Sequence, residues 1–316
     1  MILKDLNTRA INKLLALYAS IVVFLLAVWF LYIYGINSHD YEEYVTIWNL
    51  TIGKSFSYAY STVRYEIGSY FLFWSLTQVT SAAITIYIFG FIALSSKFYL
   101  IKKNYNYPLI VFTLYTLIFV PILDGNQIRA GLAVTILMFS LCINSRNLSN
   151  YLILTIIAIL FHYSGIVILI LYLTRTPLLG FIGLLVFSLT FHMLMSAFGY
   201  LAFAEYWLAS ASGKANLTSS IFIMQVCIFF VSMYSWKKLS YRQQKGAYLN
   251  AFGVLVYILF NDFAIVAHRI RELSQLGILS ILFFGDKKLS YIKFFTAICL
   301  SYIVAYGLVS TLGRLA

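Results

Sequence analysis

A short segment of the chain combines side chains that could bind an anion. It reads Asp124-Gly125-Asn126-Gln127-Ile128-Arg129, and it comes shortly after Pro121. Asp124 and Gln127 have the spacing of a helix N-cap and its capping box. Arg129 needs another explanation, because a cation at a helix N-terminus faces the positive end of the helix dipole. A guanidinium beside a helix N-terminus is a good phosphate site, so we expect Arg129 to bind an anion.

Three further residues are candidates for acid–base chemistry: Glu66, His162 and Asp40. Glu66 opens a predicted helix, where its carboxylate is either a helix cap or a fixed general base. His162 interrupts an apolar run and is followed by Gly165, which is typical of a residue lining a cavity at membrane depth. Asp40 stands in a polar segment that suits sugar binding better than proton transfer. We therefore favour Glu66 as the base and His162 as a positioning group.

A second arginine cluster follows Asp262 and reads His268-Arg269-Ile270-Arg271-Glu272. If this segment is helical, His268 and Arg271 share a face. The cluster is either a solvated segment with an internal Arg269–Glu272 pair or a second cationic clamp.

Sugar binding needs aromatic rings that stack and polar groups that meet hydroxyls. The candidates for this role are Tyr41, Tyr44, Asn126, Gln127 and His268. An interfacial aromatic belt with solvated acids is the alternative interpretation of the segment around Tyr41 and Tyr44.

These residues stand among long apolar runs. The chain has 316 residues, of which 62% are hydrophobic and 10% are charged, and its mean hydropathy is +0.89. A soluble protein carries about 25% charged residues, so a soluble enzyme is excluded. Disorder and coiled coils are excluded as well, because both need more polar residues. The runs do not alternate as barrel strands do, so the composition predicts an all-α polytopic membrane protein.

Charge placement predicts the topology. Lys4, Arg9 and Lys13 precede the first apolar run, which predicts a retained anchor with a cytoplasmic N-terminus. The basic clusters at 97–103, 146, 175, 237–245 and 287–293 are then assigned to the inside, and most acidic residues, Asp124 included, to the outside.

This assignment gives a single transmembrane domain over 1–316 with about ten to twelve helices and outer loops at about 35–66 and 198–216. The predicted spans are 14–34, 68–96, 107–121, 125–143, 149–161, 164–174, 178–197, 217–235, 247–263, 272–285 and 290–311. The long span 68–96 is expected to divide into a short piece and a full helix. The two short spans around His162 are expected to be one helix broken there.

Several kinds of site have no signature in the sequence. There is no Walker loop, GxGxxG, HExxH or CxxC motif, so neither ATP use nor a metal site is indicated and no cofactor is expected. The three cysteines all lie in apolar runs and are interpreted as core residues.

Two of these motifs together resemble a known family. Asn126-Gln127-x-Arg129-x-Gly131-Leu132-Ala133 is followed by Leu160-Phe161-His162-Tyr163-Ser164-Gly165, and this pair is similar to motifs of the EpsG/Wzy family of bacterial polysaccharide polymerases. Asp40-Tyr41-x-x-Tyr44 and Glu66-x-Gly68 resemble that family's upstream loop and helix start, although Ile67 stands where many members have proline. The resemblance covers roughly residues 35–175.

The resemblance implies a function. Members join undecaprenyl-diphosphate-linked oligosaccharide units into O-antigen (as in lipopolysaccharide), capsule or exopolysaccharide at the periplasmic face of the bacterial inner membrane. For such a substrate the resemblance implies that Arg129, Arg269 and Arg271 bind the diphosphate. It implies a glycosyltransferase fold of the GT-C-like class, contact with membrane lipid, and a chain-length regulator and a flippase as partners, with no nucleic acid. Two alternatives stay open: a lipid-linked glycan flippase or other transporter, which should show an inverted repeat, and an O-antigen ligase-like enzyme.

Overall fold

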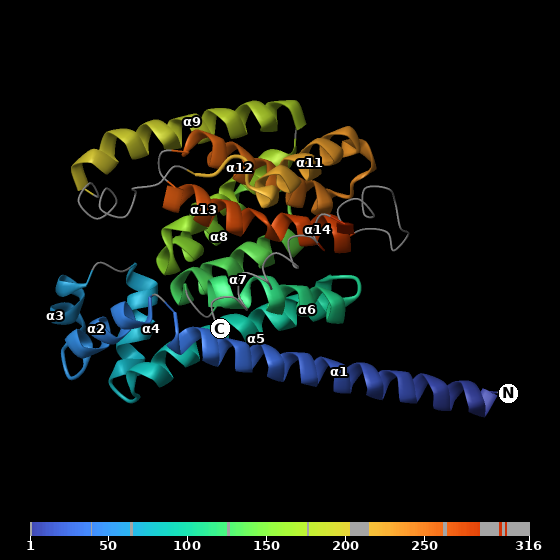
Figure 1. Cartoon of the computed structure of the whole chain (residues 1–316), viewed down its shortest axis with the longest axis horizontal. Coiled ribbons are helices and arrows are strands. Elements are labelled where there is room, and N and C mark those ends of the chain that lie inside the picture. Colours follow the sequence, from blue (N-terminus) through green and yellow to red (C-terminus); the bar gives the residue numbers. More distant parts are fainter. Residues whose placement is uncertain are drawn as a thin grey trace. The chain divides into compact units, whose positions relative to one another are not determined.

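The computed structural model describes residues 2–38, 40–63, 66–124, 127–175, 177–202, 215–261 and 264–284, with 297, 298 and 301. These residues form helices and no strand, which confirms the all-α prediction (Figure 1). The chain divides into two compact units. Unit 1 comprises 1–136 and 158–163, and unit 2 comprises 137–157 and 164–316.

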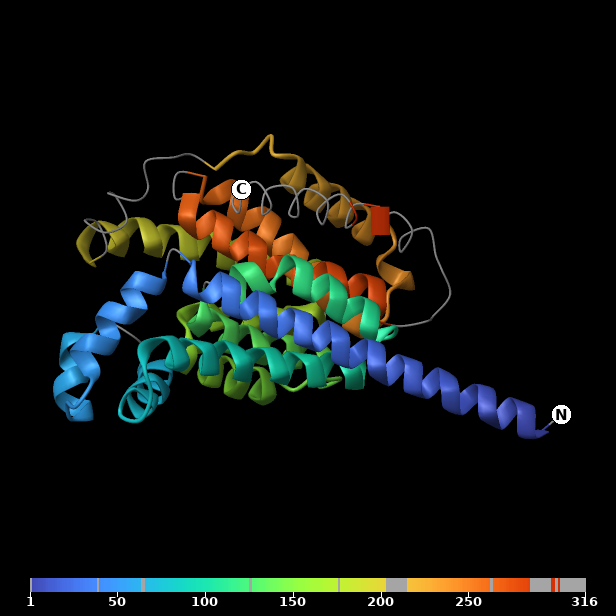
Figure 2. The same ribbon diagram turned by 60° about the horizontal axis from the view of Figure 1, so that its bottom comes forward.

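Unit 1 is built around one long N-terminal helix, α1 (Ile2–Ile36), which packs against α5 (Ala82–Asn104) and α6 (Pro108–Ile118). Figures 1 and 2 both show α1 alongside α5. The other elements of this unit are α2 (Tyr41–Thr51), α3 (Phe56–Thr62), α4 (Ile67–Thr77), the π-helical turn η1 (Val120–Asp124) and the first part of α7 (Ile128–Cys142).

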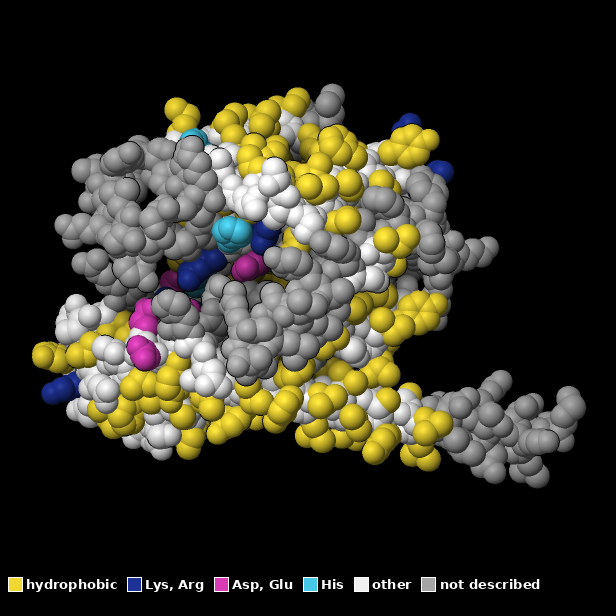
Figure 3. Space-filling view, viewed as in Figure 1, with side chains coloured by type: hydrophobic (Ala, Val, Ile, Leu, Met, Phe, Trp, Pro, Cys, Tyr) yellow, Lys and Arg dark blue, Asp and Glu magenta, His cyan; other side chains and the backbone are white. Residues whose placement is uncertain are grey.

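Two described helical segments are long and apolar enough to cross a membrane, Leu14–Ile36 and Ala82–Asn104. Hydrophobic side chains cover the described surface of α1, as Figure 3 shows, and a surface of this kind suits lipid. Shorter apolar helices account for most of the other predicted spans. The predicted span 68–96 divides into α4 and α5, as its length indicated.

The predicted outer loop 35–66 is largely helical, which the sequence interpretation missed. Its two helices are α2 and α3. Tyr44, Ile47 and Thr51 are the buried residues of α2, and they fall on one face at helical spacing. This face joins a hydrophobic cluster with Tyr70, Phe73 and Phe89. Burial of these aromatic side chains therefore orders the segment.

Unit 2 centres on α12 (Tyr241–Leu259), which packs against α9 (Pro177–Ala202), α11 (Ser220–Tyr234), α13 (Ala264–Ser274) and α14 (Leu276–Phe283). A Cβ added to Gly246 of α12 would lie 2.5 Å from the Gly277 carbonyl oxygen of α14, so glycine permits this close helix contact. The unit also contains the 3₁₀ helix η3 (Trp236–Lys238). The helix α8 (Leu148–Phe161) and the 3₁₀ helix η2 (Tyr163–Arg175) each contribute residues to both units.

Several predicted boundaries shift in unit 2. The helix α12 begins at Tyr241 rather than at 247, because Ser240 and Gln243 form a capping box there. Lys245, assigned to an inner basic cluster, is fully buried and donates to the carbonyl oxygens of Ser140 and Ile143 at 2.6 Å each. It thus caps the C-terminal end of α7. The predicted span 272–285 contains the end of α13 and all of α14, while most of 198–216 and 290–311 lies outside the described residues.

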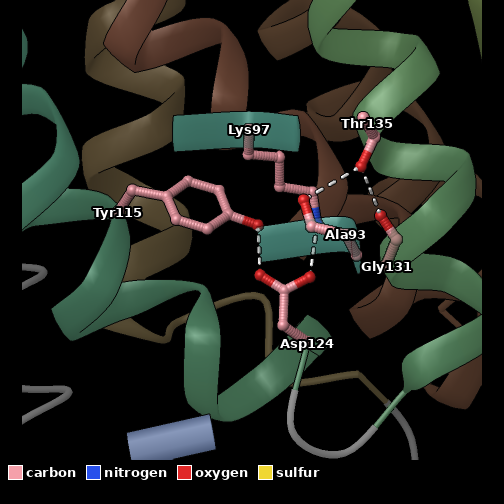
Figure 4. A network of polar contacts seen from close by, with 6 residues as sticks. All are labelled: Ala93, Lys97, Tyr115, Asp124, Gly131 and Thr135. Atoms are coloured by element: carbon pink, nitrogen blue, oxygen red, sulfur yellow. Dashed lines mark hydrogen bonds and ion pairs between the residues drawn. The ribbon is translucent and has the colours of Figure 1, made fainter. Parts of the chain in front are cut away.

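A buried polar network overturns part of the charge-based topology (Figure 4). Lys97 of α5 forms an ion pair with Asp124 Oδ1, and the Tyr115 hydroxyl donates to Asp124 Oδ2 at 2.8 Å. Both charged side chains are fully buried. The prediction placed Lys97 inside and Asp124 outside, which is wrong for one of them, because residues in contact lie at the same depth.

Candidate functional site

The central feature of unit 1 is an ion pair between two residues that are 63 positions apart. Arg129 Nη1 donates to Glu66 Oε2 at 2.9 Å, and the two side chains are 21% and 16% exposed. Arg129 is the second residue of α7, and Glu66 occupies the N-cap position of α4 without capping it through its side chain. The predicted anion partner of Arg129 is thus, in this structure, a carboxylate of the same chain.

The second oxygen of Glu66 is also bound. Glu66 Oε1 accepts a hydrogen bond from the Tyr163 backbone N–H at 3.2 Å. That amide stands where α8 ends at Phe161 and η2 begins, which confirms the predicted break at His162. The break therefore supplies the amide that fixes the carboxylate from its other side.

His162 lies beside this contact. Its side chain is 5% exposed, and its ring stacks on the Tyr163 ring with centroids 4.3 Å apart. Glu66, Arg129 and His162, three of the predicted site residues, are therefore brought to one place in unit 1, with His162 adjoining the residue whose amide binds Glu66.

Close packing of α4 against the end of α8 allows this arrangement. A Cβ added to Gly68 would lie 2.7 Å from the Leu160 carbonyl oxygen. Only glycine leaves room for α4 to approach so closely, and that approach brings Glu66 to the Tyr163 amide.

Tyr44 of α2 completes the cluster, although not as predicted. Its side chain is 2% exposed, so it has no free ring face for stacking on a sugar. Burial raises the pKa of the Tyr44 phenol, and the nearby Arg129 charge offsets this in part, so the phenol stays neutral. Asp40, at the N-cap position of α2, and Tyr41 are partly exposed and stay predictions for sugar contact.

The start of α7 is held by the buried network. Asp124 was interpreted as a helix cap, but its carboxylate binds Lys97 and Tyr115 instead, and Gln127 O accepts the first helical bond from Gly131 N. A Cβ added to Gly131 would lie 2.8 Å from Asp124 Oδ1, so the carboxylate packs directly against α7 (Figure 4). The sequence reasoning missed this role. The signal for it was Lys97, a charge within an apolar helix.

The second arginine cluster lies in α13 of unit 2. Arg271 is 8% exposed, and its guanidinium lies over the Tyr257 ring at 4.9 Å. The His268 ring meets the same tyrosine edge-on at 5.3 Å, so His268 and Arg271 share a face as predicted. Burial and the neighbouring Arg271 charge lower the pKa of His268.

The other predicted residues have mixed outcomes. Arg269 is partly exposed on α13, and the described residues show no ion pair between it and Glu272. Gln127 precedes α7 and is partly exposed, whereas Asn126 and Asp262 lie outside the described residues. Among the described part of the chain, no group of His, Cys, Asp and Glu side chains could hold a metal ion.

Of the comparisons with known proteins, only the one with protein families gives a match. No curated protein and no solved structure matches the chain. The sequence model of the EpsG family matches residues 16–314, nearly its whole length. Together with the apolar helices, this match indicates a membrane protein of the polysaccharide polymerase type. The chain belongs to the EpsG family.

Proposed function

We propose that this protein joins undecaprenyl-diphosphate-linked oligosaccharide units into a polysaccharide such as O-antigen, capsule or exopolysaccharide. Family membership supports the class of activity. The ion pair between Glu66 and Arg129 is the observation that carries the proposed chemistry, because it places a carboxylate and a guanidinium in one partly exposed position.

The reaction requires two catalytic groups, a base and a cation. A hydroxyl oxygen of the acceptor unit attacks the anomeric carbon of the growing glycan, and the bond from that carbon to the diphosphate oxygen breaks. The hydroxyl proton passes to a base, and the undecaprenyl diphosphate leaves as an anion. A positioned base and a cation that stabilises the leaving anion are therefore needed.

Glu66 and Arg129 can fill these roles if substrate separates them. In the structure Arg129 binds Glu66 Oε2. An arriving diphosphate offers a stronger charge to the guanidinium, so Arg129 turns toward it and leaves that oxygen open. The Tyr163 amide still holds Glu66 Oε1, so the carboxylate stays oriented toward the acceptor hydroxyl. His162, which stacks on Tyr163, positions the acceptor.

The direct test uses the purified protein in lipid nanodiscs with undecaprenyl-diphosphate-linked repeat units. The proposal expects a ladder of longer glycans from the wild-type protein. Glu66→Gln should still bind substrate but stop elongation, whereas Glu42→Gln, a change at an exposed acid in the same unit, should polymerise normally. If Glu66→Gln polymerises and His162→Ala does not, the two roles are reversed. Substrate that crosses the bilayer without lengthening would identify a flippase instead, and transfer only to a lipid A core would identify a ligase.

The proposed setting is the bacterial inner membrane, with several crossings, a cytoplasmic N-terminus and a GT-C-like arrangement. The charge distribution supports this orientation. A cysteine introduced at the exposed Glu43 should react with an impermeant thiol reagent in intact spheroplasts. Labelling of that cysteine only after lysis would overturn the orientation.

A further inference from the structure

An arginine in unit 2 is buried without a carboxylate partner among the described residues. Arg271 is 8% exposed, and its guanidinium brings five N–H donors and no acceptor. The ion pairs among the described residues are Lys97–Asp124 and Glu66–Arg129, so Arg271 belongs to neither. Its Nε has no hydrogen-bond acceptor in the described part of the chain. Burying a charge without an ion-pair partner costs folding free energy unless a ligand supplies the opposite charge.

Glu272, the acid next to Arg271 in sequence, does not fill this role. Its charge interacts with that of Arg271 through space, but the two side chains form no ion pair within the described residues. What Arg271 does contact is neutral. Its guanidinium lies over the Tyr257 ring at 4.9 Å, and its Nη1 donates to Ser219 Oγ over a long 3.5 Å.

That contact brings Arg271 to the N-terminus of α11, a helix of 15 residues. Ser219 is the N-cap, and its hydroxyl oxygen also accepts the Phe222 N–H at 3.3 Å. The amides of Ser220 and Ile221, at the first two helical positions, have no acceptor within the helix. They add their partial positive charge to that of the guanidinium.

The residues that lead into α11, from Asn216 to Thr218, are exposed, whereas Arg271 is buried. His268, one turn before Arg271, contacts the same Tyr257 ring at 5.3 Å and offers a further polar group at the edge of the site. A buried cation with no ion-pair partner among the described residues thus contacts a helix N-terminus, and both select an anion.

We propose that Arg271 and the first turn of α11 form a phosphate-binding site that holds the diphosphate of the lipid-linked substrate. This rests on the proposed polymerase function and assigns the diphosphate to a particular place. Arg129 already pairs with Glu66, whereas Arg271 forms no ion pair among the described residues. Arg271, rather than Arg129, therefore provides most of the resting affinity for the diphosphate.

The test measures binding to the full chain in nanodiscs, with inorganic pyrophosphate as the first probe. Arg271→Gln should weaken pyrophosphate binding at least about tenfold, because a charge-assisted contact is lost. Ser220→Pro should weaken it about threefold, because it removes one amide at the first helical position, where proline is tolerated. The extended backbone of Ser219 (φ −61°, ψ 134°) is compatible with a following proline.

The matched control is Arg242→Gln. It removes a guanidinium of the same unit that binds Asn144 Oδ1 at 3.2 Å, and it should leave pyrophosphate affinity unchanged. Each variant is first checked for a monodisperse elution profile and wild-type thermal stability. Should Arg271→Gln fail this check, Ser220→Pro decides alone. Pyrophosphate affinity within twofold of wild type in the folded variants would overturn the site.

A second arm separates the lipid diphosphate from free phosphate. Undecaprenyl diphosphate should bind the wild-type protein more tightly than undecaprenol does, and Arg271→Gln should abolish that difference. If pyrophosphate depends on Arg271 but undecaprenyl diphosphate does not, the substrate assignment is wrong. If the wild-type protein binds both probes through Arg271 but never lengthens glycans, the polymerase proposal fails and the phosphate site stands.

Discussion

The buried Lys97–Asp124 pair should be a major determinant of the stability of unit 1. The change Asp124→Asn removes the negative charge but keeps the side-chain shape. It leaves the Lys97 ammonium in a fully buried position without its counter-ion. It also alters the acceptor of the Tyr115 hydroxyl, which donates to Asp124 Oδ2 at 2.8 Å.

The magnitude follows from the burial. Removing one partner of a buried ion pair costs about 3–5 kcal/mol, because the remaining charge stays uncompensated. This corresponds to roughly a 10²- to 4 × 10³-fold shift in the unfolding equilibrium, since every 1.4 kcal/mol or so is tenfold. The double change Lys97→Met with Asp124→Leu removes both charges and should recover most of the loss.

The assay is reversible unfolding of the purified protein in mixed micelles with increasing SDS, followed by circular dichroism. Glu42→Gln, the same chemical change at an exposed acid of unit 1, provides the control and should fall within about 0.5 kcal/mol of wild type. A loss below about 1 kcal/mol for Asp124→Asn would refute the reasoning, as would a double variant less stable than the single one.

Two further predictions concern the site in unit 1. Arg129→Ala should reduce polymer formation by about 10²-fold or more while the protein stays folded. Arg129→Lys should recover little, because lysine lacks the planar fork that binds a phosphate through two N–H groups. Normal long-chain polymer in cells carrying Arg129→Ala would contradict this. Gly68→Ala should cost about 1–3 kcal/mol and lower polymer yield, because its Cβ would meet the Leu160 carbonyl oxygen at 2.7 Å. Gly183→Ala, whose Cβ would make only ordinary contacts from 3.4 Å, is its control, and equal behaviour of the two glycine variants in the unfolding and polymer assays would show that the close approach is unimportant.

For Arg129 the sequence predicts an anion partner but not which group that partner is. Its position near a helix start was anomalous for a cation, and the expectation of an anion beside it followed from the helix dipole alone. The identity of the partner could not follow, because Glu66 is 63 positions away. That contact depends on how α4 packs on the end of α8 through Gly68, and such packing leaves no local pattern.

Asp124 shows the opposite case, in which a local pattern misled. The spacing of Asp124 and Gln127 matches a capping box, and a cap contributes about 1 kcal/mol. Leaving Lys97 buried without a counter-ion would cost several times more. The larger energy decides, so Asp124 pairs with Lys97 and α7 begins at Ile128. A lysine inside an apolar helix should therefore prompt a search for an acid before its charge is assigned to a membrane face.

Arg129 and Arg271 were both predicted to bind a diphosphate, but they need not share one role. Among the described residues only Arg129 has a carboxylate partner. Because Arg129 pairs with Glu66, we expect its side chain to move when substrate arrives and to exchange the carboxylate for the diphosphate. Among the described residues the Arg271 guanidinium has no anion to exchange, because it contacts a ring and a hydroxyl. Resting affinity for an anion should therefore follow Arg271, and the rate of the chemical step should follow Arg129, so substitutions at the two positions should separate binding from turnover.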